Sequence, residues 1–205
     1  HDGNAPVLVF VDSGGSFNTD TECVNGPRGN AADHLTKDVI PFLVEEFGVS
    51  PDRGHWGVAG WSMGGTCALM LTVMHPDLFS AFVDIGGDRG PNAGSKEQTI
   101  DRLFGGDAAA WAAFDPATVI NRHGRYDGIS GWFTVPGGRA DQTKAAESLC
   151  ALGRSHGIDC AVVVQPGPHD WPYAGRAFRS ALPWLAGAIG TPDVDRVPLP
   201  AWQPR

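Results

Sequence analysis

The stretch VAGWSMGGTCALMLTV, residues 58–73, joins a short apolar run to a longer one through a serine that stands between glycines. Its residues Gly60-Trp61-Ser62-Met63-Gly64 match the pattern Gly-x-Ser-x-Gly, in which a serine occupies a sharp turn from a strand into a helix. Such a turn forces the serine backbone into an unfavourable region, and small neighbours let strand and helix approach closely. The alternative interpretation is a glycine-rich junction without chemistry, because so loose a pattern also occurs by chance.

Strand-like and helix-like apolar patterns alternate along the rest of the chain. Short β-rich runs predict strands at 6–12, 54–60, 79–87, 129–135 and 159–165. Helical spacing or long apolar character predicts helices at 31–47 with a kink at Pro41, 62–75, 140–156 and 171–189. This alternation predicts a single α/β domain over 1–205, in which helices flank a mostly parallel sheet and catalytic loops follow the strands' carboxyl ends. Residues 88–130 look like an insertion, and 188–205 form a Pro-rich tail.

Charge and hydropathy exclude several classes of partner. The 205 residues include 15 basic and 23 acidic side chains, giving a formal net charge of −8, which argues against nucleic acid or an anionic membrane surface as the partner. No apolar run approaches the roughly 18 residues that a membrane span needs. The chain opens HDGNAP, with neither an initiator Met nor a secretion signal, so we expect a processed protein or a piece of a longer one.

The four cysteines can indicate whether the protein works in an oxidising or a reducing compartment. They are Cys23, Cys67, Cys150 and Cys160, with no C-x-x-C pair and no histidine at zinc-ligand spacing, so we expect neither a metal nor another cofactor. We favour the pairs Cys150–Cys160 and Cys23–Cys67, and the alternative is four reduced, buried thiols. Oxidised pairs would indicate an exported protein.

A serine nucleophile needs a base and an acid. His169, in the loop QPGPHDW that follows the last expected strand, stands where the base of such a fold is found, after the nucleophile and the acid in chain order. Asp141 follows the strand 129–135 at a helix start, where it would orient the imidazole; its alternative role is to cap that helix. The alternative interpretation of His169 is an ordinary histidine in a surface loop.

The oxyanion hole is incomplete in this sequence. The backbone N–H of Met63 supplies one donor, and the second is expected from a loop after a strand that would precede residue 6, or otherwise from DSGGSF, residues 12–17. Four aromatic residues near the expected strand ends are candidates for binding substrate, with ordinary core packing as the alternative. They are Trp61, Phe17, Trp132 and Trp171.

Taken in order, VDSGGSFNTD, GWSMGG, HPDLFSAFVDIGG and PHDW resemble the α/β-hydrolases of the esterase D-like branch, which contains the secreted cell-envelope mycolyltransferases and related esterases. The resemblance implies a serine carboxylic-ester hydrolase with the triad Ser62, Asp141 and His169, or an acyltransferase that acts on a sugar hydroxyl. The substrate would be a small-molecule, lipid or glycolipid ester.

The same resemblance implies an extracytoplasmic location, with any membrane tether in a segment outside this sequence. The family's first strands and their oxyanion loop are absent from it, and GGRADQ around Asp141 departs from the mycolyltransferases' Glu-bearing sequence. Two rivals remain: a non-catalytic binding protein on the same fold, and a cytosolic thioester hydrolase acting on glutathione adducts, which disulfides would exclude.

Overall fold

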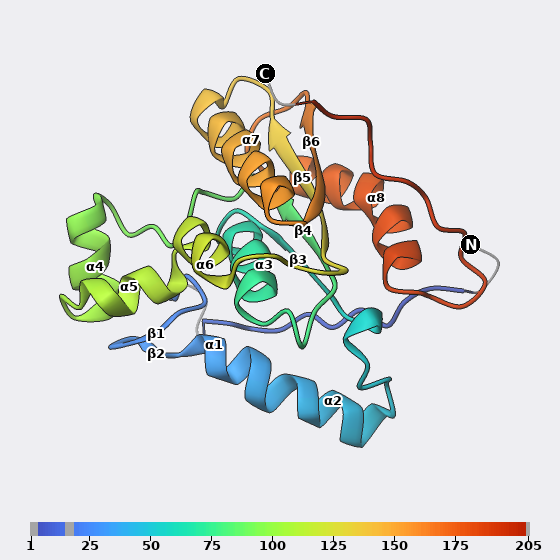
Figure 1. Cartoon of the computed structure of the whole chain (residues 1–205), viewed down its shortest axis with the longest axis horizontal. Coiled ribbons are helices and arrows are strands. Elements are labelled where there is room, and N and C mark those ends of the chain that lie inside the picture. Colours follow the sequence, from blue (N-terminus) through green and yellow to red (C-terminus); the bar gives the residue numbers. More distant parts are fainter. Residues whose placement is uncertain (1–3, 15–18, 204–205) are drawn as a thin grey trace.

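Four strands form one parallel sheet in the order β3-β4-β5-β6 (Figure 1). The structure, a computed structural model, describes residues 4–14 and 19–203. The strands are β3 (Gly57–Trp61), β4 (Ala81–Ile85), β5 (Ser130–Pro136) and β6 (Asp159–Gln165). Four of the five predicted strands are thereby confirmed within a few residues. Their regular register brings all four carboxyl ends to one edge of the sheet.

Helices cover both faces of this sheet (Figure 1). Alternate residues of a strand point to opposite faces. Thus Ala81, Val83 and Ile85 of β4 pack with α8 (Trp171–Ala188), whereas Phe82 packs in the cluster that includes α3 (Met63–Met74) and α7 (Ala140–Ser155). The central strands β4 and β5 are therefore buried on both sides, as their nearly continuous apolar sequences predict, whereas the edge strands β3 and β6 are partly exposed.

The predicted helix at 31–47 is continuous but irregular. It comprises α1 (Ala31–Asp33), a π-helical segment η1 (His34–Val39) and α2 (Ile40–Phe47). Pro41 has no N–H to donate to the preceding turn, so the regular hydrogen-bond ladder is interrupted where the kink was predicted.

The remaining elements are short. A two-residue hairpin joins β1 (Asn25–Gly26) to β2 (Gly29–Asn30), and a 3-10 turn, η2 (Arg53–His55), precedes β3. The predicted insertion holds α4 (Lys96–Phe104), α5 (Ala108–Phe114) and α6 (Pro116–His123).

The strand predicted at 6–12 is wrong. Residues 4–12 form no strand, because no neighbouring strand pairs with them. Both predicted disulfides, Cys23–Cys67 and Cys150–Cys160, are present. None of the helices in the described ranges combines the length and apolar character needed to cross a bilayer.

Candidate active site

Ser62 occupies the strained turn that its sequence pattern predicts. It lies between β3 and α3 with φ 55° and ψ −118°, a backbone conformation that is rare for a residue with a side chain. A Cβ atom on Gly60 would overlap the backbone of Gly64, and one on Gly65 would clash with the Asp84 carboxylate. The glycines are thus required for the close approach of strand and helix that puts Ser62 at the sheet's carboxyl edge.

The start of α3 offers hydrogen-bond donors next to Ser62. The helix begins at Met63, so the N–H groups of Met63 and Gly64 have no acceptor within the helix, while those of Gly65 and Thr66 donate to the Ser62 carbonyl at 2.9 and 3.1 Å. Free N–H groups at a helix N-terminus favour negative charge. The Met63 N–H is therefore available to an oxyanion formed at Ser62. In the alternative donor loop at 12–17, residues 15–17 lie outside the described part of the chain.

His169 lies over the same edge of the sheet, in the loop between β6 and α8. Its ring centroid is 5.0 Å from that of Trp61, and a Cβ on Gly86 would lie 3.1 Å from its Cε1 and Nδ1 atoms. Trp61 and Ile85 are register partners at the ends of β3 and β4, which places the histidine above these two strand ends. In the described residues, no hydrogen bond reaches the His169 ring or the Ser62 hydroxyl.

Electrostatics favour a neutral His169. Burial lowers the pKa of His169, and the Arg139 guanidinium acts in the same direction, whereas Asp88 and Asp170 oppose them. Nδ1 is buried and has no hydrogen-bond partner. At neutral pH the imidazole is therefore unprotonated and able to accept a proton.

Asp141 and His169 are not in contact in this structure. Asp141 is exposed in the first turn of α7, and no hydrogen bond joins it to the imidazole. The next residue, Gln142, is buried and donates from Nε2 to the Gly86 carbonyl at 2.8 Å, so this turn does border the site.

A second carboxylate near the base was missed by sequence reasoning. Asp88 follows the carboxyl end of β4, its N–H donates to Thr66 Oγ1 at 2.9 Å, and its carboxylate accepts from Asn92 Nδ2 at 2.8 Å. Its charge raises the pKa of His169 against the larger effect of burial. The available signal was its place after a strand's carboxyl end, in IGGD.

Two buried carboxyl groups, those of Asp84 and Glu22, lie in the same part of the molecule as Asp88. Burial raises the pKa of Asp84, in β4 beneath the Ser62 turn, to about 7, and its carboxylate accepts from the Gly87 N–H at 2.7 Å. Burial, with Asp20 and Asp88 adding to it, raises the pKa of Glu22 to about 8. Near neutral pH the Glu22 carboxyl is thus largely protonated, whereas the Asp84 carboxyl is about half protonated.

The four predicted aromatic residues have different surroundings. Trp61 and Trp171 contact each other with ring centroids 4.3 Å apart, and Trp61 also contacts His169, so both lie at the site. Trp132 is 8% exposed and packs against Trp184 of α8, which makes it a core residue. Phe17 lies outside the described residues. No cluster of possible metal ligands occurs in the described ranges.

Comparison with known proteins shows which family the chain belongs to. Residues 4–185 match the model of the family described as "Putative esterase". The chain belongs to this esterase family. An uncharacterized protein of Corynebacterium glutamicum is 32% identical over 192 residues; the match covers 91% of this chain and 45% of that protein. The chain thus spans about half the length of this curated relative.

Solved structures show that this esterase-family chain has the α/β-hydrolase fold, confirming the predicted resemblance. S-formylglutathione hydrolase from Agrobacterium tumefaciens superposes with a TM-score of 0.68 at 16% identity, covering 84% of this chain and 64% of that one. The fluorophosphonate-binding serine hydrolase FphF of Staphylococcus aureus gives 0.63 at 15% identity, with coverages of 81% and 68%. MPT51 of Mycobacterium tuberculosis gives 0.61 at 18% identity, with coverages of 83% and 74%.

Proposed function

We propose that the protein is a serine carboxylic-ester hydrolase. One observation carries the proposal: Ser62 is held in a strained turn at the N-terminus of α3, with a neutral His169 over the same strand ends. Strain of this kind persists only where the surrounding structure enforces it, and it presents the hydroxyl at the edge of the sheet. Membership of the esterase family supports the same assignment.

The reaction follows from this arrangement. His169 takes the Ser62 proton as the hydroxyl oxygen attacks the ester carbonyl, and the resulting oxyanion is stabilised by the Met63 N–H. Because Nδ1 is buried beside Gly86, Nε2 is the nitrogen that exchanges the proton. His169 then gives the proton to the leaving alcohol, and water, activated by the same histidine, releases the acid from the acyl-enzyme.

We propose Asp141 as the acid that orients His169. It follows β5, and His169 follows the adjacent strand β6, so the two residues stand after neighbouring carboxyl ends. Its role would be to accept from Nδ1–H and to stabilise the imidazolium. Asp88 is the competing candidate, because its charge already acts on His169.

We also propose that the protein is exported and that it acts on acyl esters of small molecules, lipids or glycolipids. Two disulfides support an oxidising compartment for the protein. Transfer to a sugar hydroxyl instead of water would make the same acyl-enzyme an acyltransferase. The alternative function is that of a non-catalytic binding protein on the same fold.

Hydrolysis of p-nitrophenyl butyrate, measured on the protein with its natural flanking sequence, tests the proposal. Ser62→Ala should lower kcat/KM by about 10⁴-fold or more, because the variant has no nucleophile. Ser148→Ala, an exposed serine on α7, is the matched control and should leave the rate unchanged. Equal rates for wild type and Ser62→Ala would reject the esterase and favour the binding protein.

A further inference from the structure

The loop that follows β4 lies against the imidazole of His169. Its first residue, Gly86, has φ 61°, and a Cβ atom there would lie 3.1 Å from both Nδ1 and Cε1 of His169 and 3.5 Å from Cδ of Pro136. The imidazole therefore packs on the bare Cα of this glycine, in a space that a side chain would fill. The place of the base thus depends on where the loop holds Gly86.

The N–H groups of residues 86–88 all donate to buried acceptors, one on each of three elements. In chain order the acceptors are Thr134 O of β5 at 2.7 Å, Asp84 Oδ1 of β4 at 2.7 Å and Thr66 Oγ1 of α3 at 2.9 Å. All three residues are buried, where hydrogen bonds are strong and costly to leave unmade. The loop is therefore tied to the central strands and to the helix that begins beside Ser62.

The peptide unit between Gly86 and Gly87 is held at both of its polar ends. Its N–H is the one that donates to Asp84, and its carbonyl oxygen accepts from Gln142 Nε2 at 2.8 Å. Because glycines flank this unit on both sides, no Cβ atom of its own residues opposes rotation of the peptide plane. The two hydrogen bonds therefore determine its orientation. Gln142 supplies one of them from the first turn of α7, the turn that also carries Asp141.

Gln142 makes this hydrogen bond from a buried position. Its side chain is 6% exposed, and its Oε1 atom has no hydrogen-bond partner in the described residues. Burying an amide oxygen without a partner destabilises the fold, so packing alone would favour an apolar side chain here. Its neighbour Asp141 is exposed, since consecutive residues of a helix point about 100° apart. What the Gln142 amide contributes at this position is therefore its bond to Gly86.

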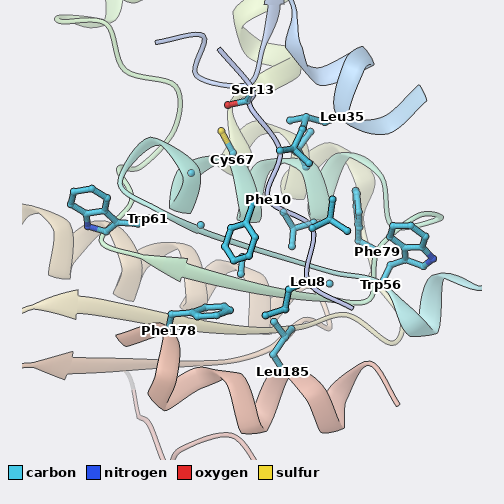
Figure 2. A pocket seen from close by; sticks show the side chains of 18 of the residues that line it. Leu8, Phe10, Ser13, Leu35, Trp56, Trp61, Cys67, Phe79, Phe178 and Leu185 are labelled. Carbon is cyan, nitrogen blue, oxygen red and sulfur yellow. The ribbon is translucent and has the colours of Figure 1, made fainter. Parts of the chain in front are cut away.

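The large cavity beside the site does not include this loop. An apolar groove of about 600 Å³ lies along β3 and residues 6–11, and Figure 2 shows Trp61 at its end near the carboxyl ends of the strands. Neither Gln142 nor any of residues 86–88 lines this groove. A change at Gln142 should therefore alter the base and leave the space beside Ser62 intact, which predicts an effect on kcat with little effect on KM.

We propose that Gln142 is a positioning residue for the base: by holding the Gly86 carbonyl it fixes the surface on which the His169 imidazole lies, and so keeps Nε2 directed at the Ser62 hydroxyl. It acts through Gly86 and does not touch the substrate. Its role differs from that of the acid, because the amide holds the backbone beside the ring and, in the described residues, makes no hydrogen bond to the ring itself. The inference rests on the proposed function, since it assigns Gln142 a part in the esterase reaction.

Hydrolysis of p-nitrophenyl butyrate by Gln142→Met, in the protein with its natural flanking sequence, tests this role. Methionine keeps the length of the side chain but has no N–H, so kcat should fall roughly tenfold to 100-fold while KM stays within about twofold. Gln98→Met, which replaces an exposed glutamine of α4, is the matched control and should keep wild-type kinetics. A wild-type kcat for Gln142→Met, or a loss confined to KM, would overturn the proposal. Failure of the proposed function would show instead as a wild type no faster than Ser62→Ala.

Gln142→Glu adds a pH-dependent readout in a variant of the same shape. A protonated carboxyl can donate to the Gly86 carbonyl, and a carboxylate cannot. Over the pH range in which His169 is neutral in both proteins, kcat relative to wild type should therefore fall as the introduced carboxyl ionises. The other charged groups that act on His169 are common to both proteins; they are Arg139, Asp88 and Asp170. A kcat equal to that of wild type at every pH would overturn the proposal.

The Gly87 amide reports on the same peptide unit independently of catalysis. Its hydrogen exchange, resolved by NMR, should become at least about tenfold faster in Gln142→Met relative to the exchange of the Val83 amide. Val83 lies in the middle of β4, which pairs with strands on both sides, so its amide serves as the internal control. A lower kcat with unchanged exchange at Gly87 would overturn the proposal, because Gln142 would then act by another route.

Discussion

The two disulfides close loops of very different length, and this difference predicts their separate contributions to stability. Cys23–Cys67 spans 44 positions and Cys150–Cys160 spans 10. Treated as a restriction of the unfolded chain, these loops stabilise the fold by about 4 and about 2.7 kcal/mol at 25 °C, a difference of about 1.3 kcal/mol. All four sulfurs are buried, so replacing each pair by alanine creates similar cavities, which leaves loop length as the principal difference.

The comparison is made with Cys23→Ala/Cys67→Ala and Cys150→Ala/Cys160→Ala. Urea unfolding followed by tryptophan fluorescence gives each free energy by linear extrapolation, and equal m-values validate the comparison. The variant without Cys23–Cys67 should be the less stable by about 1.3 kcal/mol. Because Cys67 belongs to α3, which carries Ser62 at its start, this variant should also lose more esterase activity. A less stable Cys150→Ala/Cys160→Ala variant would refute the reasoning.

Three further predictions concern the site. The pKa of Glu22 is about 8 in the folded state, above its ordinary 4.5, so ionisation of this carboxyl lowers the free energy of unfolding progressively as pH rises between these values. Glu22→Gln should therefore raise the free energy of unfolding at pH 8 by on the order of 3–5 kcal/mol. An equal gain at pH 4, measured by urea unfolding, would contradict this. His169 must be neutral to act as a base and burial lowers its pKa, so kcat/KM should rise with pH with a midpoint below 6.5. Trp61→Ala should shift this midpoint and reduce kcat at least tenfold, because Trp61 contacts the imidazole. An unchanged pH profile would show that Trp61 does not position the imidazole. Asp141→Asn should reduce kcat by about 10³–10⁴-fold and Asp88→Asn by less than tenfold; the reverse order would transfer the role of the acid to Asp88.

The sheet and its nucleophile turn could be predicted because local sequence determines both. Strands such as 159–165 are short apolar runs between polar loops, and the prediction at that segment agrees with β6 residue for residue. The turn at Ser62 needs glycine at positions 60 and 65, so its conformation is encoded in one short stretch of sequence, residues 60–65. The disulfide pairs followed from the expected order of strands, loops and helices.

Features that depend on distant partners could not be predicted in the same way. Residues 6–12 have the composition of a buried strand, but a strand requires a neighbour, and in this structure the segment lies unpaired beside the groove. Trp132 lies on a strand near the end of the sheet expected to carry the site, yet its side chain packs against α8 in the core. Asp88 was missed because only the tertiary structure brings its charge within range of His169.

Covalent labelling with a fluorophosphonate tests the identity of the nucleophile most directly. The protein with its natural flanking sequence is incubated with the probe, digested and mapped by mass spectrometry. We expect one adduct, on Ser62, which Ser62→Ala abolishes and His169→Ala slows by several orders of magnitude. A protein that remains unlabelled at Ser62, or is labelled at another serine with Ser62 intact, would contradict the assignment of Ser62 as the nucleophile.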